Sequence, residues 1–302
     1  MSLTARLMRT LSIALLLVCC LCHSGSATAA DGAAALRKQY EALTPQLNNS
    51  PFQRMLHLDS VESTSTLKGD IYAVMDYPFT GINSELADPE KGAANWCDVL
   101  ILHPNIKYCH APSGGKGKSI SMNIGNKGEQ SLTDAYRLDF NYRVAAAGPE
   151  YFRIDLNADS GPLGTRDYHI VLEALAIDSK HTFLHFTYSY SYGMAERMAM
   201  NAYLSTLGRN KVGFTHTGRQ SNGQPDYIDG VRGLVERNTM RYYLAIDAYL
   251  SALSLPAEKR LEKRLSNWFG VSEQYARQLH EMERQEYMQM KYHEYRRQQT
   301  ER

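Results

Sequence analysis

The chain of 302 residues has few cysteines and no apolar run long enough to cross a membrane. Three of its five cysteines lie before residue 23, so only Cys97 and Cys109 serve the rest of the chain. The apolar run from Leu11 to Leu21 is shorter than the roughly 20 residues that a membrane-spanning helix needs. The sequence therefore predicts no membrane-spanning segment and at most one disulfide within the chain.

An excess of charge of one sign is also missing. Residues 1–29 hold two of the 33 basic residues, Arg6 and Arg9, and none of the 32 acidic ones, so the chain that follows has a formal charge of −1. A chain so close to neutral has no electrostatic reason to bind nucleic acid or an anionic surface. We therefore expect no nucleic-acid partner.

Motifs for metal binding and for nucleophilic catalysis are absent from the sequence. The histidines are scattered without H-x-H or H-E-x-x-H spacing, and no G-x-S-x-G stretch occurs. We therefore expect no metal, no cofactor and no catalytic residue that can be named. The best acid–base candidate is His185, which would lie near Glu173 if the strands around the two residues pair. The alternative is a solvated histidine on the outer face of a sheet.

The N-terminal residues have the pattern of an export signal. Two arginines precede the short apolar run, and Ala27-Thr28-Ala29 matches a cleavage site, so residues 1–29 are interpreted as a signal peptide. None of the three early cysteines follows a small residue, which disfavours a lipid-anchored protein. The expected product is soluble, periplasmic or secreted, and without a stable membrane anchor.

Cys97 and Cys109 are predicted to form a disulfide. They are the pair that remains after signal cleavage, and an oxidising compartment favours the bond. The alternative is two buried free thiols.

Alternating aromatic residues are the most informative pattern in the chain. Successive side chains of a strand point to opposite faces, so one surface would carry four rings and the other would carry the small polar groups between them. The rings are Phe186, Tyr188, Tyr190 and Tyr192. Such a face must be covered by a helix or a second sheet, or must line a pocket.

Similar alternation precedes this strand and predicts an antiparallel meander. A strand with one buried and one solvent-exposed face is typical of an antiparallel sheet, since buried parallel strands are apolar throughout. The predicted strands are 120–124, 136–144, 152–157, 168–177 and 182–192, after earlier ones at 55–58 and 68–77. Predicted helices are 30–47, short pieces between 78 and 99, 194–207, 230–253 and much of 258–302, with a further strand at 211–215 and a polar loop at 218–223.

Arg241 stands out in the helix predicted from Gly230 to Leu253. Its neighbours are apolar on nearly every face of that helix, which implies burial on several sides. A buried guanidinium needs a partner, either an acid or carbonyl of the protein or the anionic head group of a ligand. Both alternatives remain open at this stage.

The order of these elements resembles the helix-grip fold of the START and polyketide-cyclase-like superfamily. The resemblance covers residues 54–254 and rests on the strand at 72–77, the connection with Trp96-Cys97-Asp98-Val99-Leu100, the strand at 188–192 and the helix at 230–253. It implies an α+β fold in which a curved antiparallel sheet wraps around the long C-terminal helix, with extra helices at both ends. The expected organisation is a signal peptide (1–29), an N-terminal helix (30–53), the helix-grip-like domain (54–254) and a charged helical tail (255–302).

The resemblance also implies a cavity for a hydrophobic molecule. The expected function is an exported carrier or binding protein for a hydrophobic small molecule or lipid, in an internal cavity, with a protein partner that contacts the tail. The alternatives are an enzyme of the same fold that uses cavity Tyr, His or Arg groups, and a structural protein with a packed core. The candidate ligand contacts are Tyr142, Tyr188, Tyr190, Tyr192, Arg241 and Tyr242.

Overall fold

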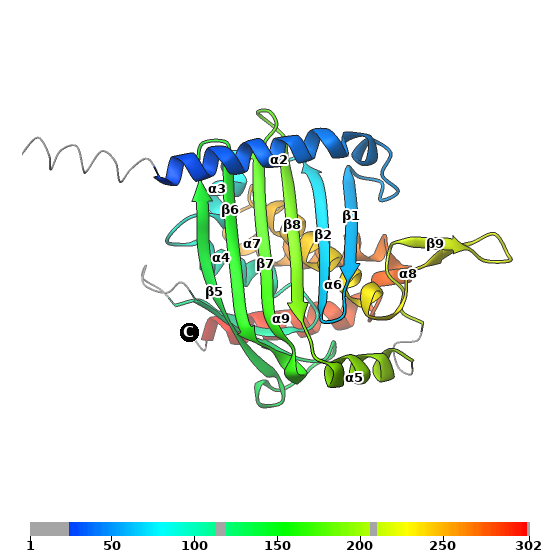
Figure 1. Ribbon diagram of the computed structural model, residues 1–302. Helices are drawn as coiled ribbons and strands as arrows, with labels where there is room; N and C mark the ends of the chain where they lie inside the picture. The colour runs from blue at the N-terminus through cyan, green and yellow to red at the C-terminus, as the bar shows by residue number, and fades with distance from the viewer. Residues whose placement is uncertain (1–23, 113–118, 206–209, 301–302) are drawn as a thin grey trace, which may run out of the picture.

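Figure 1 shows a curved antiparallel sheet with one helix across its outer face and several helices on its inner face. The computed structural model describes residues 24–112, 119–205 and 210–300. Its eight-stranded sheet has the order β1-β2-β8-β7-β6-β5-β4-β3, and every neighbouring pair is antiparallel. The expected α+β class is confirmed.

The element bounds follow the predicted pattern closely. The strands are β1 (Leu56–Glu62), β2 (Thr66–Met75), β3 (Ile106–His110), β4 (Ser119–Ile124), β5 (Tyr136–Ala147), β6 (Tyr151–Ser160), β7 (Arg166–Ala176), β8 (Thr182–Ser191), β9 (His216–Arg219) and β10 (Pro225–Tyr227). The helices are α2 (Ser24–Asn48), α3 (Phe79–Leu86), α4 (Gly92–Leu100), α5 (Met194–Ser205), α6 (Gly230–Leu250), α7 (Ala257–Glu273), α8 (Ala276–Leu279) and α9 (Arg284–Thr300). Short 3-10 turns are η1 (Leu132–Asp134) and η2 (Pro162–Gly164).

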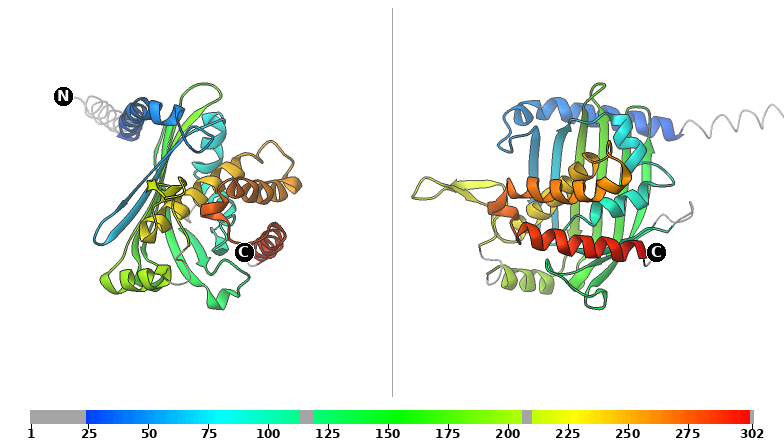
Figure 2. Two further views of the ribbon diagram at one scale, coloured as in Figure 1. Left: turned by 90° about the vertical axis from the view of Figure 1, so that its right-hand side faces the viewer. Right: turned by 180° about the vertical axis from the view of Figure 1, so that it is seen from behind.

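The two faces of the sheet are covered differently. In Figure 2 the helix α2 lies on one side of the sheet, and α6, α7 and α9 lie on the other. On the outer face Leu36, Leu43 and Leu47 of α2 belong to a small apolar cluster with Phe183 of β8, whose ring lies 5.0 Å from that of Tyr40. This helix explains why the upper part of β8 is buried on both faces although the sequence alternates.

The arrangement around α6 is that of a helix-grip fold. Two short helices, α3 and α4, connect β2 to β3, the meander β3 to β8 follows, and α6 then packs against β1, β2 and β8. The hairpin partner β1 adds an extra strand at the edge of the sheet. The rings of Phe140, Tyr142, Tyr188 and Tyr190 all lie buried on the face that carries α6, as predicted.

Residues 255–300 pack against the rest of the protein. Trp268 of α7 and Tyr287 of α9 stack with their ring centroids 4.9 Å apart, and both belong to the same apolar core as the sheet and α6. The Tyr287 hydroxyl donates a hydrogen bond to the carbonyl of Leu102 (2.8 Å). The helices α7 and α9 thus cover the side of α6 that the sheet leaves open.

Three segments differ from expectation. The segment 211–215 is not a strand, because the amides of Phe214 and Thr215 donate to the buried carboxylate of Glu236 instead of to a neighbouring strand. The expected loop at 218–223 belongs to the hairpin of β9 and β10. The long helix α6 ends at Leu250, three residues before the predicted end.

The predicted disulfide lies within the described residues, whereas most of the predicted signal peptide does not. The disulfide between Cys97 and Cys109 is present and joins α4 to β3. Of the predicted signal peptide, residues 1–23 lie outside the described part of the chain, and residues 24–29 form the start of α2.

Candidate ligand-binding site

Four tyrosines form a continuous cluster between the sheet and α6. Tyr168 of β7 stacks on Tyr190 of β8 with ring centroids 5.2 Å apart, and Tyr188 lies 5.7 Å from Tyr190. Tyr242 of α6 closes the cluster from the helix side at 5.3 Å from Tyr188. Strand pairing places the first three rings on one face, because β7 and β8 are neighbours in the sheet.

These rings keep a little accessible surface although they lie deep in the protein. Tyr188 is 7% exposed and Tyr242 is 6% exposed, whereas Phe186, which also packs against Tyr242, has no exposed surface. In the described part of the chain no hydrogen bond involves the hydroxyl of Tyr188 or Tyr242. Since buried hydroxyls nearly always have a partner, the two groups are available to water or to a bound molecule.

The hydroxyls of the cluster are neutral. Burial raises the pKa of Tyr168 to about 12, and burial raises the pKa of Tyr188 and of Tyr242 further above the usual value. The hydroxyl of Tyr168 shares a hydrogen bond of 2.7 Å with the hydroxyl of Thr165. At neutral pH these groups therefore act as hydrogen-bond donors and acceptors rather than as bases.

A histidine adjoins the cluster. The ring of His103 stacks on Tyr242 with centroids 4.8 Å apart, and the amide of Asn105 donates to its Nδ1 (3.1 Å). The proton of the neutral ring therefore sits on Nε2, a buried atom with no hydrogen-bond partner among the described residues. Burial lowers the pKa of His103 well below the usual value, and the nearby Arg241 lowers it further, so the ring is uncharged.

Two of the predicted ligand contacts have protein partners for their hydroxyls. Tyr142 donates to the carbonyl of Leu86 (2.8 Å) near the end of α3. Tyr192, which follows β8, donates to the carbonyl of Ser63 (3.0 Å) in the turn between β1 and β2. Both side chains fasten neighbouring segments to the sheet, so the cluster is formed by Tyr188, Tyr190 and Tyr242 together with Tyr168.

Arg241 has an acidic partner within the protein. Its guanidinium forms an ion pair with Glu281, which also binds Lys127 (2.6 Å) and Lys211 (3.0 Å). Burial alone would raise the pKa of Glu281, but the charges of Arg241 and Lys127 outweigh it and hold the pKa below the usual value. Of the two alternatives for this buried charge, the structure contains the protein partner.

Sequence reasoning did not select Tyr168 or His103. The alternation 168-170-172 places Tyr168 on the apolar face, so a comparison of that face between neighbouring strands could have found it. His103 follows the apolar run 99–102 and carries no local signal, because its contact with Tyr242 depends on how α4 packs against α6.

The outer face of the sheet carries a polar groove of about 490 Å³ around His185. The ring lies between two carboxylates, with Nε2 at 2.9 Å from Asp70 and Nδ1 at 3.1 Å from Glu173. Burial would lower the pKa of His185, but the hydrogen bonds to Asp70 and Glu173 outweigh it and raise the pKa. The predicted closeness of His185 to Glu173 is confirmed, and the ring is 15% exposed rather than solvated.

Arg and Asp residues of β5 and β6 form ion pairs both between the two strands and within β6. Arg143 reaches Asp155 at 2.7 Å, and Arg153 reaches the same carboxylate at 2.8 Å. The two guanidiniums are exposed on the outer face of the sheet, whereas the carboxylate of Asp155 that they share is buried.

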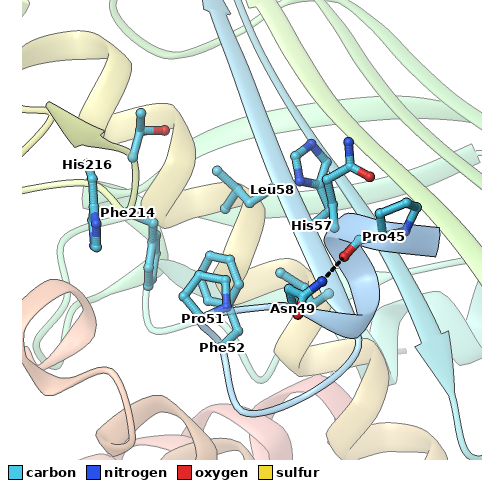
Figure 3. A pocket seen from close by; sticks show the side chains of 11 residues that line it. Pro45, Asn49, Pro51, Phe52, His57, Leu58, Phe214 and His216 are labelled. Carbon is cyan, nitrogen blue, oxygen red and sulfur yellow. Dashed lines mark hydrogen bonds between the residues drawn. The ribbon is translucent and has the colours of Figure 1, made fainter. Parts of the chain in front are cut away.

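An apolar pocket of about 540 Å³ lies at the β1 edge of the sheet, away from the tyrosine cluster (Figure 3).

Within the described residues, no group of three or more His, Cys, Asp or Glu side chains is placed to hold a metal ion. Over the same residues, no helix combines the length and apolarity needed to cross a membrane.

Comparison with known proteins finds similarity in structure alone. No family model matches the sequence, and no curated protein matches it. A START superfamily protein from Mycobacterium smegmatis is similar over 48% of this chain and 92% of its own, at 12% identity and a TM-score of 0.30. A norcoclaurine synthase from Thalictrum flavum is similar over 49% and 91%, at 14% identity and a TM-score of 0.33. The Zhui aromatase/cyclase from Streptomyces sp. R1128 is similar over 73% and 96%, at 10% identity and a TM-score of 0.31.

The chain has a helix-grip-like architecture, in which the curved sheet packs around α6. Its strand order, its two connecting helices and the gripped α6 carry that assignment. Similarities with such low identities and TM-scores do not support any conclusion about the ligand or the activity of this chain.

Proposed function

We propose that the protein binds a hydrophobic small molecule or lipid between the sheet and α6, as a carrier that does not change it chemically. The observation that supports this best is the pair of hydroxyls on Tyr188 and Tyr242, which lie in an aromatic interior, keep accessible surface and have no partner among the described residues. A wholly packed interior would satisfy such groups or replace them with phenylalanine.

The chemistry of the cluster narrows the class of ligand. Its walls are aromatic, and its polar groups are the neutral hydroxyls together with the uncharged ring of His103. A charged head group would lose its hydration there, and the nearby charge of Arg241 is already balanced by Glu281. The proposed ligand therefore has an apolar ring or alkyl body and one or two neutral polar groups, such as a hydroxyl or carbonyl.

The helix α5 is the proposed cover of this site. Met200 of α5 lies over the hydroxyl of Tyr190, with its sulfur 4.0 Å from the oxygen, and α5 also packs against α6. Its opposite side exposes Met194 and Met198, which are 81% and 68% exposed. Methionine side chains adapt easily to different apolar partners, which suits a helix that must move aside for a ligand.

Export forms part of the same proposal. The signal pattern of residues 1–29 and the single disulfide of the remaining chain both fit an oxidising compartment outside the cytoplasm. The enzyme alternative receives less support from the cluster, because general acids and bases work best with a pKa near the operating pH, and burial moves the pKa values of Tyr188, Tyr242 and His103 away from neutrality.

The test begins with organic extraction of protein purified without detergent and mass spectrometry of the extract. Binding is then measured with N-phenyl-1-naphthylamine, a neutral apolar dye. We expect a co-purified small molecule, and we expect Tyr188→Phe and Tyr242→Phe each to weaken retention of that molecule about fivefold, since one hydrogen bond contributes about 1 kcal/mol.

Tyr136→Phe is the matched control, because Tyr136 is a half-exposed ring on β5 outside the cluster. The proposal is overturned if no small molecule is extracted and the dye binds neither the wild type nor the variants. It is also overturned if dye binding is unchanged by a bulkier side chain on the cluster face, such as Ile170→Phe, in a variant that still folds.

A further inference from the structure

The pocket at the edge of the sheet lies outside the gripped interior. Its walls come from the end of α2, the loop that follows it, β1 and the segment before β9, as Figure 3 shows. Most of its surface is apolar, and the side chains responsible are Pro45, Pro51, Phe52, Leu56, Leu58 and Phe214. A volume of about 540 Å³ is within the range of small-ligand and side-chain sites.

The pocket wraps around the free edge of β1. Leu56 and Leu58 point to the face that carries α6 and are buried, whereas His57 points to the outer face, where its ring lies 6.2 Å from Tyr72. All three side chains line the pocket. In Figure 3 Leu58 and His57 leave β1 on opposite sides, so the pocket opens along the strand edge and not on one face.

The backbone of Leu58 faces this edge. The amide of Val74 donates to the carbonyl of Met55, and in the antiparallel register the odd-numbered residues of β1 therefore bond to β2 while the even-numbered ones point away. No hydrogen bond within the described residues involves the N–H or C=O of Leu58.

At each neighbouring edge residue, Leu56 and Ser60, one outward backbone group is already occupied. The carbonyl of Leu56 accepts a hydrogen bond from the hydroxyl of Ser50 (2.6 Å), and the amide of Ser60 donates to the carboxylate of Asp59 (2.8 Å). Edge strands commonly limit pairing with other chains in this way. Here Leu58, beside the pocket, keeps both its N–H and its C=O open among the described residues, whereas Leu56 and Ser60 each have one group occupied.

The opposite wall of the pocket is held in place without a ligand. Glu236 of α6 is fully buried and accepts hydrogen bonds from the amides of Phe214 and Thr215, as well as from the hydroxyl of Ser60. The ring of Phe214 packs 5.7 Å from that of Phe52. A wall fixed in advance reduces the entropy that binding would cost.

We propose that the edge of β1 at Leu58 and this pocket bind a short extended peptide segment of a partner protein. The peptide backbone would pair with the N–H and C=O of Leu58, and one large apolar side chain would enter the pocket. A small molecule could fill the apolar space, but only an extended backbone offers a donor and an acceptor at the spacing of a strand. The occupied groups at Leu56 and Ser60 restrict the pairing to a few residues.

The experiment uses a display library of random heptapeptides selected on the immobilised full chain. The selected peptides are synthesised, and their binding is measured by calorimetry. Gln46→Trp places a large ring at the mouth of the pocket, because Gln46 is an exposed lining residue of α2. Ala42→Trp is the matched control, an exposed position on the same helix that does not line the pocket.

We expect the selected peptides to share a large apolar residue and to bind the wild type and Ala42→Trp equally. Gln46→Trp should weaken binding at least tenfold, and bound peptide should slow hydrogen exchange at the Leu58 amide at least tenfold. Failure to select any peptide overturns the proposal. It is also overturned if a bound peptide does not slow hydrogen exchange at the Leu58 amide, or if Gln46→Trp does not change the affinity for the peptide. Binding of the naphthylamine dye that Gln46→Trp abolishes, with no peptide binding, would identify the pocket as a small-molecule site instead.

Discussion

The guanidinium of Arg241 on α6 forms an ion pair with the carboxylate of Glu281, in the segment between α8 and α9. Arg241 is almost fully buried, and Glu281 is only 10% exposed. The contact joins the gripped helix to residues that follow it by 40 positions. It explains how a strongly charged C-terminal sequence packs onto an apolar core.

Arg241→Ala should lower the free energy of unfolding by about 3 kcal/mol. Breaking a buried ion pair costs about 3–5 kcal/mol, and the lower end applies because Glu281 keeps Lys127 and Lys211. Urea unfolding measures the loss. Lys211→Ala, at a position that is about one-third exposed, should cost less than about 1 kcal/mol. Unchanged stability combined with lost ligand retention would instead make Arg241 a ligand contact.

His185 should make stability depend on pH. Its pKa is raised in the folded protein, so its contribution is complete below about 6.5, the usual histidine value, and is lost as the pH rises through the folded pKa. The pKa values of Asp70 and Glu173 are lowered: burial would raise them, but the hydrogen bonds from His185 outweigh it. Their contribution is present above about pH 4 and is lost as the pH falls through their folded pKa values.

The measurement is urea unfolding of the wild type and of His185→Gln between pH 5 and 8. The difference in stability between the two proteins should be largest near pH 5.5 and should shrink as the pH rises. An NMR titration of the His185 ring should give a midpoint above 6.5. A midpoint below that value would contradict the assigned hydrogen bonds.

Glu294→Gln should destabilise the protein by about 3–5 kcal/mol at pH 7. Glu294 accepts hydrogen bonds from Lys107 (3.0 Å) and Lys291 (2.6 Å), and neither lysine has exposed side-chain surface. Without the carboxylate, two buried ammonium groups would lack an acidic partner. Burial lowers the pKa of Lys291 to about 8 even though Glu294 opposes the shift, so the loss should be smaller at pH 9, where this lysine is largely neutral.

Glu286→Gln is the control for that change, because Glu286 is an exposed residue of the same helix. Its effect should stay within about 0.5 kcal/mol. Equal melting of the two variants would show that the buried lysines do not depend on Glu294.

Replacing Cys97 and Cys109 together by serine should lower stability by about 3 kcal/mol, the amount expected for a disulfide that closes a loop of this length. A thiol assay on denatured, unreduced protein should find no free thiol from this pair. Two reactive thiols would show that the bond does not form in the protein.

The sequence alone determined the sheet and the helix that it grips. Alternation in β5, β6 and β8 depends only on which side of a strand each residue occupies, so the positions of Phe140, Tyr188 and Tyr190 on one face could be read directly. The disulfide could also be predicted, because a single pair of cysteines leaves one pairing.

Only the tertiary structure decided which groups meet across the interior and at the edge. The stacking of His103 on Tyr242, the pairing of Arg241 with Glu281 and the binding of Glu236 to the amide of Phe214 each join residues that are distant in the sequence. Such contacts depend on how finished elements pack, and local propensity and periodicity contain no information about them. The open edge at Leu58 also could not be predicted from the sequence, since a strand lies at the edge of a sheet only because of the order of all the strands.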